Sequence, residues 1–361
     1  MNHKTFNYLL FFAIIFSIVA AAVVIKEPTI QSSDFNGDLI FPELAQKLEK
    51  LEKIVIKQKD TSFTLNYSSN GWSMLERGGY PVNSSKVSEL LIGLTTAIII
   101  EPKTELSHKY GRLDLADPSG DENSRAKRVT FSDSSGSIFT DFFVGKRKFT
   151  LGAEKGGTYL RLVAFPQTWL VSGEINPGSR PRDWLQREIL DIPSNDIRKV
   201  KVTHADGSSF IVSKADKDTQ DYSMANMPAD MKLKRTDILN DIGSILSGFL
   251  FDDVKPFDQF KFSEGKVFIS EFYAFSGLAI TLELYELGDE NWLRLKAIPS
   301  SEKKTARNKA SEGLNEIELL DLVSDINSKT DLWVYKLPAY EVAPLKKVKE
   351  DLLDPIENLE N

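Results

Sequence analysis

Hydrophobic residues are arranged along this chain in two different ways. Residues 6–25 form one predominantly apolar run without a charged side chain, in which only Asn7, Ser17 and the Tyr8 hydroxyl are polar, whereas the rest of the chain mixes apolar and polar positions. A helix over this run would be roughly 30 Å long, which is close to the hydrocarbon thickness of a bilayer. Because no later segment resembles it, the pattern predicts one transmembrane helix from Phe6 to Ile25, followed by a water-soluble body.

The apolar run can also be interpreted as a cleavable signal peptide. Lys4 supplies a basic residue before it, and Ala20–Ala22 supplies small residues for a cleavage site. The run continues through Ile25, and this length favours an uncleaved signal anchor. Residues 1–5 would then stay in the cytoplasm. We therefore expect a single-pass membrane protein whose body lies on the export side.

The pattern after the anchor predicts an α+β body. Residues 26–52 are expected to form a tether and a short helix, and residues 53–175 a first unit of strands around one helix. Asn70-Gly71 marks a hairpin between two of the strands. Apolar residues at helical spacing over 87–98 predict the helix, which ends before Pro102.

The same order of elements then recurs. Residues 176–195 are expected to be a linker with a short helix over 184–190, and residues 196–299 a second unit. Tyr222-Ser223-Met224 stands where Trp72-Ser73-Met74 stands in the first unit, and a helix is expected over 238–249. This recurrence predicts a tandem duplication.

Each unit is therefore expected to be a mostly antiparallel sheet with one helix packed on its apolar face. Residues 300–361 are predicted to form a helix-strand-helix tail that packs on the second unit, because the apolar residues around Trp333 would otherwise be exposed.

Composition limits the chemistry that can be expected. The net charge of −7 disfavours nucleic acid as a partner, and the absence of cysteine excludes disulfides and thiolate sites. The three histidines, His3, His108 and His204, are far apart, and the acidic residues at 114–122 lack the spacing of a calcium loop. No metal, cofactor or catalytic residue is predicted.

Motifs for catalysis or phosphate binding are also missing from the sequence. It contains neither a Gly-x-Ser-x-Gly elbow nor a phosphate-binding glycine loop, and 145–148 is interpreted as a basic hairpin turn. One loop is a candidate for recognition: Gly111 permits close backbone approach, and Tyr110 and Arg112 are residue types favoured at interfaces. The alternative is a tight turn between helix and sheet.

Several short motifs resemble those of the DUF4340 family and come in the family's order. They include Leu39–Leu44 after the membrane segment, Gly71–Met74, Tyr110–Asp114, Phe143–Lys146, Tyr159–Arg161, Asp183–Leu185 and Trp333–Pro338. Arg112 departs from the family's pattern, in which Gly-Leu-Asp follows the tyrosine directly. The resemblance implies a single-pass bacterial membrane protein, often encoded beside ABC-transporter components of the gliding-motility type, and no established catalytic residues.

Together these features favour a membrane-anchored, non-enzymatic accessory protein on the export side, associated with an ABC-type transporter or another envelope complex. An alternative is an envelope hydrolase or ligand-binding protein with a site between the two repeats. A third is a structural spacer without a pocket.

Overall fold

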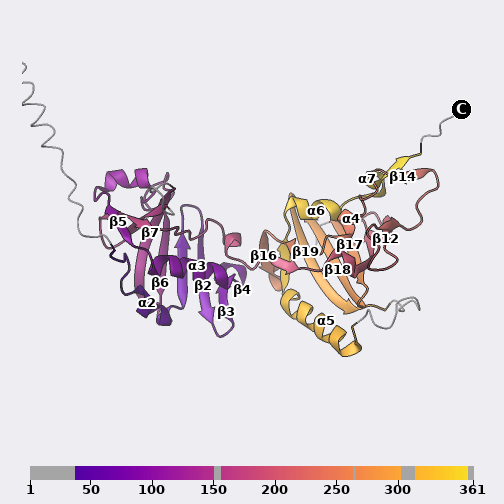
Figure 1. The fold of residues 1–361 in the computed structure, drawn as a ribbon, viewed down its shortest axis with the longest axis horizontal. Helices are drawn as coiled ribbons and strands as arrows, with labels where there is room; N and C mark the ends of the chain where they lie inside the picture. Colours follow the sequence, from indigo (N-terminus) through magenta and orange to yellow (C-terminus); the bar gives the residue numbers. More distant parts are fainter. Residues whose placement is uncertain (1–36, 150–155, 263–265, 302–313, 357–361) are drawn as a thin grey trace, which may run out of the picture. The chain divides into compact units, whose positions relative to one another are not determined.

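Strands dominate the architecture of this protein (Figure 1). The computed structural model describes residues 37–149, 156–262, 266–301 and 314–356. The predicted transmembrane helix, Phe6–Ile25, lies outside these residues. Within them, no helix is both long and apolar enough to cross a membrane.

The described chain divides into two compact units. One contains the residues up to Ser62 together with Ser88–Pro177, and the other contains Phe63–Val87 together with the residues from Gly178 onward.

The first large sheet has nine strands in the order β4-β3-β2-β1-β6-β7-β8-β9-β5. Their bounds are β1 (Lys53–Lys57), β2 (Ser62–Ser68), β3 (Gly71–Met74), β4 (Tyr80–Pro81), β5 (Ile99–Pro102), β6 (Lys127–Ser132), β7 (Ile138–Lys148), β8 (Gly157–Leu162) and β9 (Thr168–Ser172). Side chains that alternate between its faces bury an apolar core that includes Ile54, Ile56, Phe131, Phe142 and Leu160.

The second large sheet has eight strands in the order β13-β12-β11-β17-β18-β19-β20-β16. Their bounds are β11 (Ile197–Thr203), β12 (Ser209–Ser213), β13 (Ser223–Met224), β16 (Asp253–Pro256), β17 (Lys266–Ala274), β18 (Leu278–Leu287), β19 (Glu290–Pro299) and β20 (Trp333–Lys336). Two small sheets pair β10 (Glu188–Leu190) with β15 (Phe249–Leu250), and β14 (Met231–Leu233) with β21 (Leu353–Pro355).

The two large sheets follow the same strand order. The series β3-β2-β1-β6-β7-β8-β9-β5 in the first sheet matches β13-β12-β11-β17-β18-β19-β20-β16 in the second, and β4 is an additional edge strand. The equivalent strands β5 and β16 both end at a proline, Pro102 and Pro256. Strands pair in the antiparallel direction in both sheets, for example β6 with β7 and β18 with β19. The mostly antiparallel α+β class predicted from the sequence is confirmed.

Helices are few and mostly short. The described α-helices are α2 (Leu44–Lys47), α3 (Ser84–Thr95), α4 (Asn240–Gly243), α5 (Glu316–Thr330), α6 (Ala339–Leu345) and α7 (Lys349–Leu352). The 3₁₀ segments are η1 (Leu48–Lys50), η2 (Leu75–Arg77), η3 (Ser107–Leu113), η4 (Pro181–Asp183), η5 (Ser194–Asp196) and η6 (Phe257–Gln259). Helix α3 buries Val87, Leu90 and Leu94, as its apolar spacing predicts.

The helix predicted over 238–249 is wrong in extent. α4 covers only Asn240–Gly243, although Ile242, Ile245 and Leu246 are buried as expected. Tyr222 packs directly on Gly243, where an added Cβ would lie 2.1 Å from the tyrosine ring. The Tyr222 hydroxyl donates to the carbonyl oxygens of Ser194 and Ile197, which holds the ring against this turn. After α4 the chain turns, with the Ser247 amide donating to the Ser244 carbonyl, and Phe249–Leu250 then pairs as strand β15 with β10 instead of continuing the helix.

Two further local predictions are wrong. The segment 184–190 contains no helix, because Trp184 follows the η4 turn and the chain then pairs as strand β10 with β15. The residues 145–148, interpreted as a basic turn, belong to the long strand β7. Arg147 and Lys148 pair there with Thr158 and Gly157 of β8.

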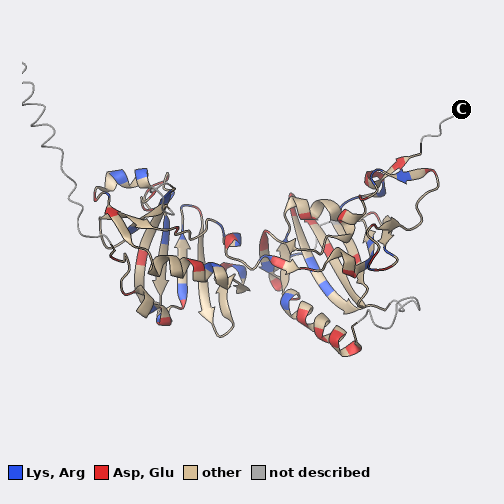
Figure 2. Ribbon diagram, in the orientation of Figure 1, with Lys and Arg blue, Asp and Glu red and all other residues tan. Residues whose placement is uncertain are grey.

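Helix α5 is capped at its start, and its acidic residues, marked red in Figure 2, are exposed. The Asn315 side chain accepts from the Glu318 amide, and the Glu318 carboxylate accepts from the Asn315 amide. On α5, Asn327 faces β19: its amide oxygen accepts from the Ala297 amide, and its amide nitrogen donates to the Ala297 carbonyl, both at 2.9 Å.

Candidate functional site

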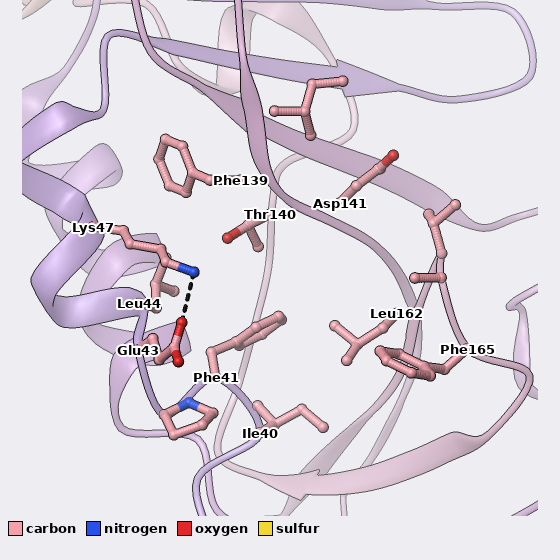
Figure 3. A pocket seen from close by; sticks show the side chains of 14 residues that line it. Ile40, Phe41, Glu43, Leu44, Lys47, Phe139, Thr140, Asp141, Leu162 and Phe165 are labelled. Carbon is pink, nitrogen blue, oxygen red and sulfur yellow. Dashed lines mark ion pairs between the residues drawn. The ribbon is translucent and has the colours of Figure 1, made fainter.

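An open apolar pocket of about 730 Å³ lies in the first unit, beside helix α2 (Figure 3). Its lining comes from three segments that are distant in the sequence: 40–47 around α2, 138–141 at the start of β7, and 162–165 at the end of β8. Ten of the fourteen lining side chains are apolar, namely Ile40, Phe41, Pro42, Leu44, Ile138, Phe139, Leu162, Val163, Ala164 and Phe165. The volume is typical of sites that bind small molecules.

The segment around Phe41 forms one wall of the pocket. The Phe41 ring packs 5.0 Å from the ring of Phe142, and Leu44 is buried on the first turn of α2. The Leu44 amide donates to the Phe41 carbonyl, which closes the turn that leads into the helix. Residues 40–44 of this wall belong to the Leu39–Leu44 motif.

The opposite side of the pocket presents apolar side chains to solvent. Ile138 is 59% exposed and Phe165 is 58% exposed, and both lie in the lining of this one pocket. Phe165 closes a turn, because its backbone amide donates to the Leu162 carbonyl. Figure 3 shows Phe165 and Leu162 beside the same hollow as Phe41.

Charged groups that line the pocket are already paired. The Glu43 carboxylate lies 2.7 Å from the Lys47 ammonium, and the hydrogen bond from Lys47 lowers the pKa of Glu43. Asp141 accepts two hydrogen bonds from the Arg128 guanidinium, at 3.0 and 2.6 Å, and a third from the Thr130 hydroxyl. The same pairing raises the pKa of Arg128. The pocket therefore combines apolar surface with neutralised charge.

Tyr110 and Arg112, the predicted recognition pair, do not form one surface. Tyr110 is buried, and its hydroxyl donates to the carbonyl oxygens of Pro166 and Glu105, at 2.6 and 3.2 Å. Arg112 is exposed near the end of η3. The ring of Tyr110 packs into the core, and the residue lies in the 3₁₀ segment η3, which connects strands β5 and β6.

The ring of Tyr110 packs on a buried arginine. The Arg161 guanidinium carbon lies 4.5 Å from the centroid of the Tyr110 ring and 4.3 Å from that of Phe143. Arg161 is 9% exposed, its Nη2 lies 3.5 Å from the Leu115 carbonyl oxygen, and its Nε has no hydrogen-bond partner. Burial lowers the pKa of Arg161. Aromatic faces thus pack against this buried cation.

Metal-ligating side chains do not gather anywhere in the described part of the chain. His204 lies in the second unit, where its ring contacts the Lys347 carbonyl and the Ser208 hydroxyl, and His3 lies outside the described residues. Asp117 and Asp121 accept from backbone amides two residues later, so they act as turn residues.

Sequence reasoning missed the pocket because it is assembled from separate segments. Ile138 and Phe165 gave a weak signal, since each is a large apolar residue beside a turn: Ile138 follows Gly136-Ser137, and Phe165 precedes Pro166. Whether other side chains cover such a residue depends on the tertiary packing, which a single sequence does not show.

Comparison with known families places the chain among proteins that share this domain. The family model DUF4340, described as a domain of unknown function, matches residues 72–255, and the chain belongs to this family. The resemblance inferred from the short motifs is confirmed. No curated protein and no solved structure matches the chain.

Proposed function

We propose that this chain is a membrane-anchored, non-enzymatic accessory protein on the export side of the bacterial inner membrane. In this proposal Phe6–Ile25 is the single transmembrane helix, and the body arose by duplication of one sheet-forming unit. The partner is a subunit of an ABC-type transporter or of another envelope complex. Support comes from the apolar run in the sequence and from the gene neighbours that the family resemblance implies.

One observation carries the binding role: the first motif after the tether builds an open apolar pocket rather than a cluster of reactive groups. Ile138 and Phe165 are exposed at the pocket, and the charges that line it are paired. An apolar surface of this kind favours binding over acid–base chemistry, which needs titratable groups free to exchange protons. The common strand order of the two large sheets supports the duplication.

The proposal is tested by cross-linking in native membranes with an amine-reactive reagent, followed by identification of the captured proteins. The matched control replaces residues 1–25 with a cleavable signal peptide, which releases the same body into the periplasm. We expect a transporter or envelope-complex subunit with the anchored form and a strong reduction with the released form. Protection of the body from protease added to spheroplasts would contradict the predicted orientation.

A further inference from the structure

We propose that the apolar pocket beside α2 binds an acyl chain of a membrane lipid. This inference rests on the proposed function, because the anchor is what keeps the pocket near the bilayer. It adds a ligand class to the pocket, and it concerns the lining segments 40–47, 138–141 and 162–165.

The position of the pocket in the chain places it within reach of lipid. Its first lining residue is Ile40, and the apolar run ends at Ile25. The intervening residues 26–39 span at most about 50 Å when fully extended. A pocket on so short a tether stays close to the membrane surface, where acyl chains are the most abundant apolar groups.

The chemistry of the lining favours an occupant without charge. The carboxylates of Glu43 and Asp141 are paired with Lys47 and Arg128, so a charged occupant would have to compete with existing ion pairs. The remaining lining residues are apolar apart from Thr140. A hydrocarbon chain can fill this volume through burial of apolar surface alone.

Backbone groups around the pocket disfavour an added peptide strand. The amide of Val163 donates to the Asp141 carbonyl, and the amide of Phe165 donates to the Leu162 carbonyl. On the other side, Thr140 pairs with Phe131 of β6. Strand addition needs free amides and carbonyls along an edge, whereas an acyl chain needs none. We therefore favour lipid over an extended segment of a protein partner.

The test uses the full-length chain reconstituted in phosphatidylcholine vesicles. A trace of phosphatidylcholine with a photoactivatable diazirine on one acyl chain is added, and labelled peptides are identified by mass spectrometry after illumination. We expect label on the pocket segments 40–47, 138–141 or 162–165 and also on the apolar run 6–25. Label on the run serves as an internal standard, and its absence would count against the anchor rather than the pocket.

Ile138 and Phe165 are exposed residues at the rim of the pocket. Variants of these two residues distinguish binding in the pocket from general contact with lipid. Ile138→Ser combined with Phe165→Ser should reduce pocket label by about tenfold relative to label on the run, because two apolar contacts are lost. Phe165→Leu, which keeps an apolar side chain, should retain most of it. The control Ile92→Ser changes a residue that is 62% exposed on α3 and lies outside the pocket lining, and it should leave the ratio unchanged.

Three outcomes would overturn the inference. The first is label confined to the apolar run, and the second is pocket label that the double rim variant does not reduce. The third is capture of a protein instead of lipid by a photoreactive amino acid placed at position 165 in cells. Circular dichroism of each variant confirms that the fold is retained, which is expected because both rim residues are exposed.

Discussion

Arg161 and Arg294 occupy equivalent places in two sheets that share one strand order. Each lies in an aromatic-Leu-Arg-Leu sequence, on β8 and on the equivalent strand β19. Each also stacks on a ring from the 3₁₀ segment that follows the equivalent strands β5 and β16: Arg161 on Tyr110 of η3, and Arg294 on Phe257 of η6 at 4.4 Å. Their surroundings nevertheless differ, since Arg161 is buried while the side chain of Arg294 is 34% exposed.

The cross-strand neighbours explain the difference. Arg161 pairs across the sheet with Phe143, whereas Arg294 pairs with Glu283, whose carboxylate lies 4.0 Å away. Two residues further along the same strands, Gly145 in the first sheet corresponds to Tyr285 in the second. At Gly145 the backbone of η3 approaches the sheet closely, because only a hydrogen faces the Leu113 carbonyl. The ring of Tyr285 instead packs against Phe260, which directly follows η6. A repeated strand motif therefore yields a buried packing cation in one sheet and a surface ion pair in the other.

The largest effect is expected from Gly145→Ala. An added Cβ would lie 2.2 Å from the Leu113 carbonyl oxygen, a backbone atom that cannot move without shifting the η3 loop. We expect the free energy of unfolding to fall by about 3 kcal/mol. Urea denaturation of the full chain in detergent measures it, with Gly120→Ala as the control because its Cβ would meet nothing within 4 Å. Equal stability of the two variants would contradict the close approach of the loop.

The second-largest effect is expected from replacing the two arginines, and the loss of stability should differ between the two sheets. Arg161→Ala leaves a hole between two rings and should lower the free energy of unfolding by about 2–3 kcal/mol, whereas Arg294→Ala should cost less than about 1 kcal/mol. Arg161→Met, which fills the space without charge, should recover most of the loss. The same denaturation measurement decides. If Met is as damaging as Ala, the charge matters more than the packing.

A smaller difference is expected for the rings beneath these arginines. Tyr110→Phe keeps the stack but removes the hydroxyl that donates to the Pro166 and Glu105 carbonyls, and should lower the free energy of unfolding by about 1 kcal/mol. Phe257→Tyr on η6 is the matched reciprocal change and should be close to neutral. Thermal unfolding of both variants beside the parent chain provides the comparison. A neutral Tyr110→Phe would mean that the hydroxyl contributes nothing to holding η3 against the sheet.

The smallest effect is a pH dependence of stability at Tyr285 in the second sheet. Burial, followed by the hydrogen bond to Glu283, raises the pKa of Tyr285 from 10 to about 12. Because the unfolded chain loses this proton first, the stability from Tyr285 is present below pH 10 and is lost as pH rises towards 12. Ultraviolet titration of tyrosinate should show one late-titrating group fewer in Tyr285→Phe. If the titration curve of Tyr285→Phe matched that of the parent chain, the raised pKa would not belong to Tyr285.

Much of the fold follows from local pattern, and the exceptions have physical causes. Alternation and the Asn70-Gly71 turn predict the β2–β3 hairpin, and apolar spacing predicts α3. The expected helix over 238–249 is shorter because Phe249–Leu250 pairs as strand β15 with β10, a segment about sixty residues earlier in the sequence. A single amino-acid sequence does not show which distant segments come into contact.

The candidate site shows the same limit more strongly. Tyr110 and Arg112 have the residue types of an interface, but residue type alone cannot indicate that Tyr110 would be covered by Arg161 and Phe143. The exposed pocket residues Ile138 and Phe165 lie beside turns, one where β7 begins and the other just after β8 ends. Family membership could be predicted because short motifs keep their order irrespective of burial.

The amide side chain of Asn327 has a consequence for self-association. Beyond Leu293, where β20 no longer accompanies β19, a helix residue takes the place of a neighbouring strand at Ala297 by supplying both a donor and an acceptor. A second molecule cannot add its own strand there without first displacing α5. This part of the sheet is therefore protected against the edge-to-edge aggregation to which exposed strands are prone.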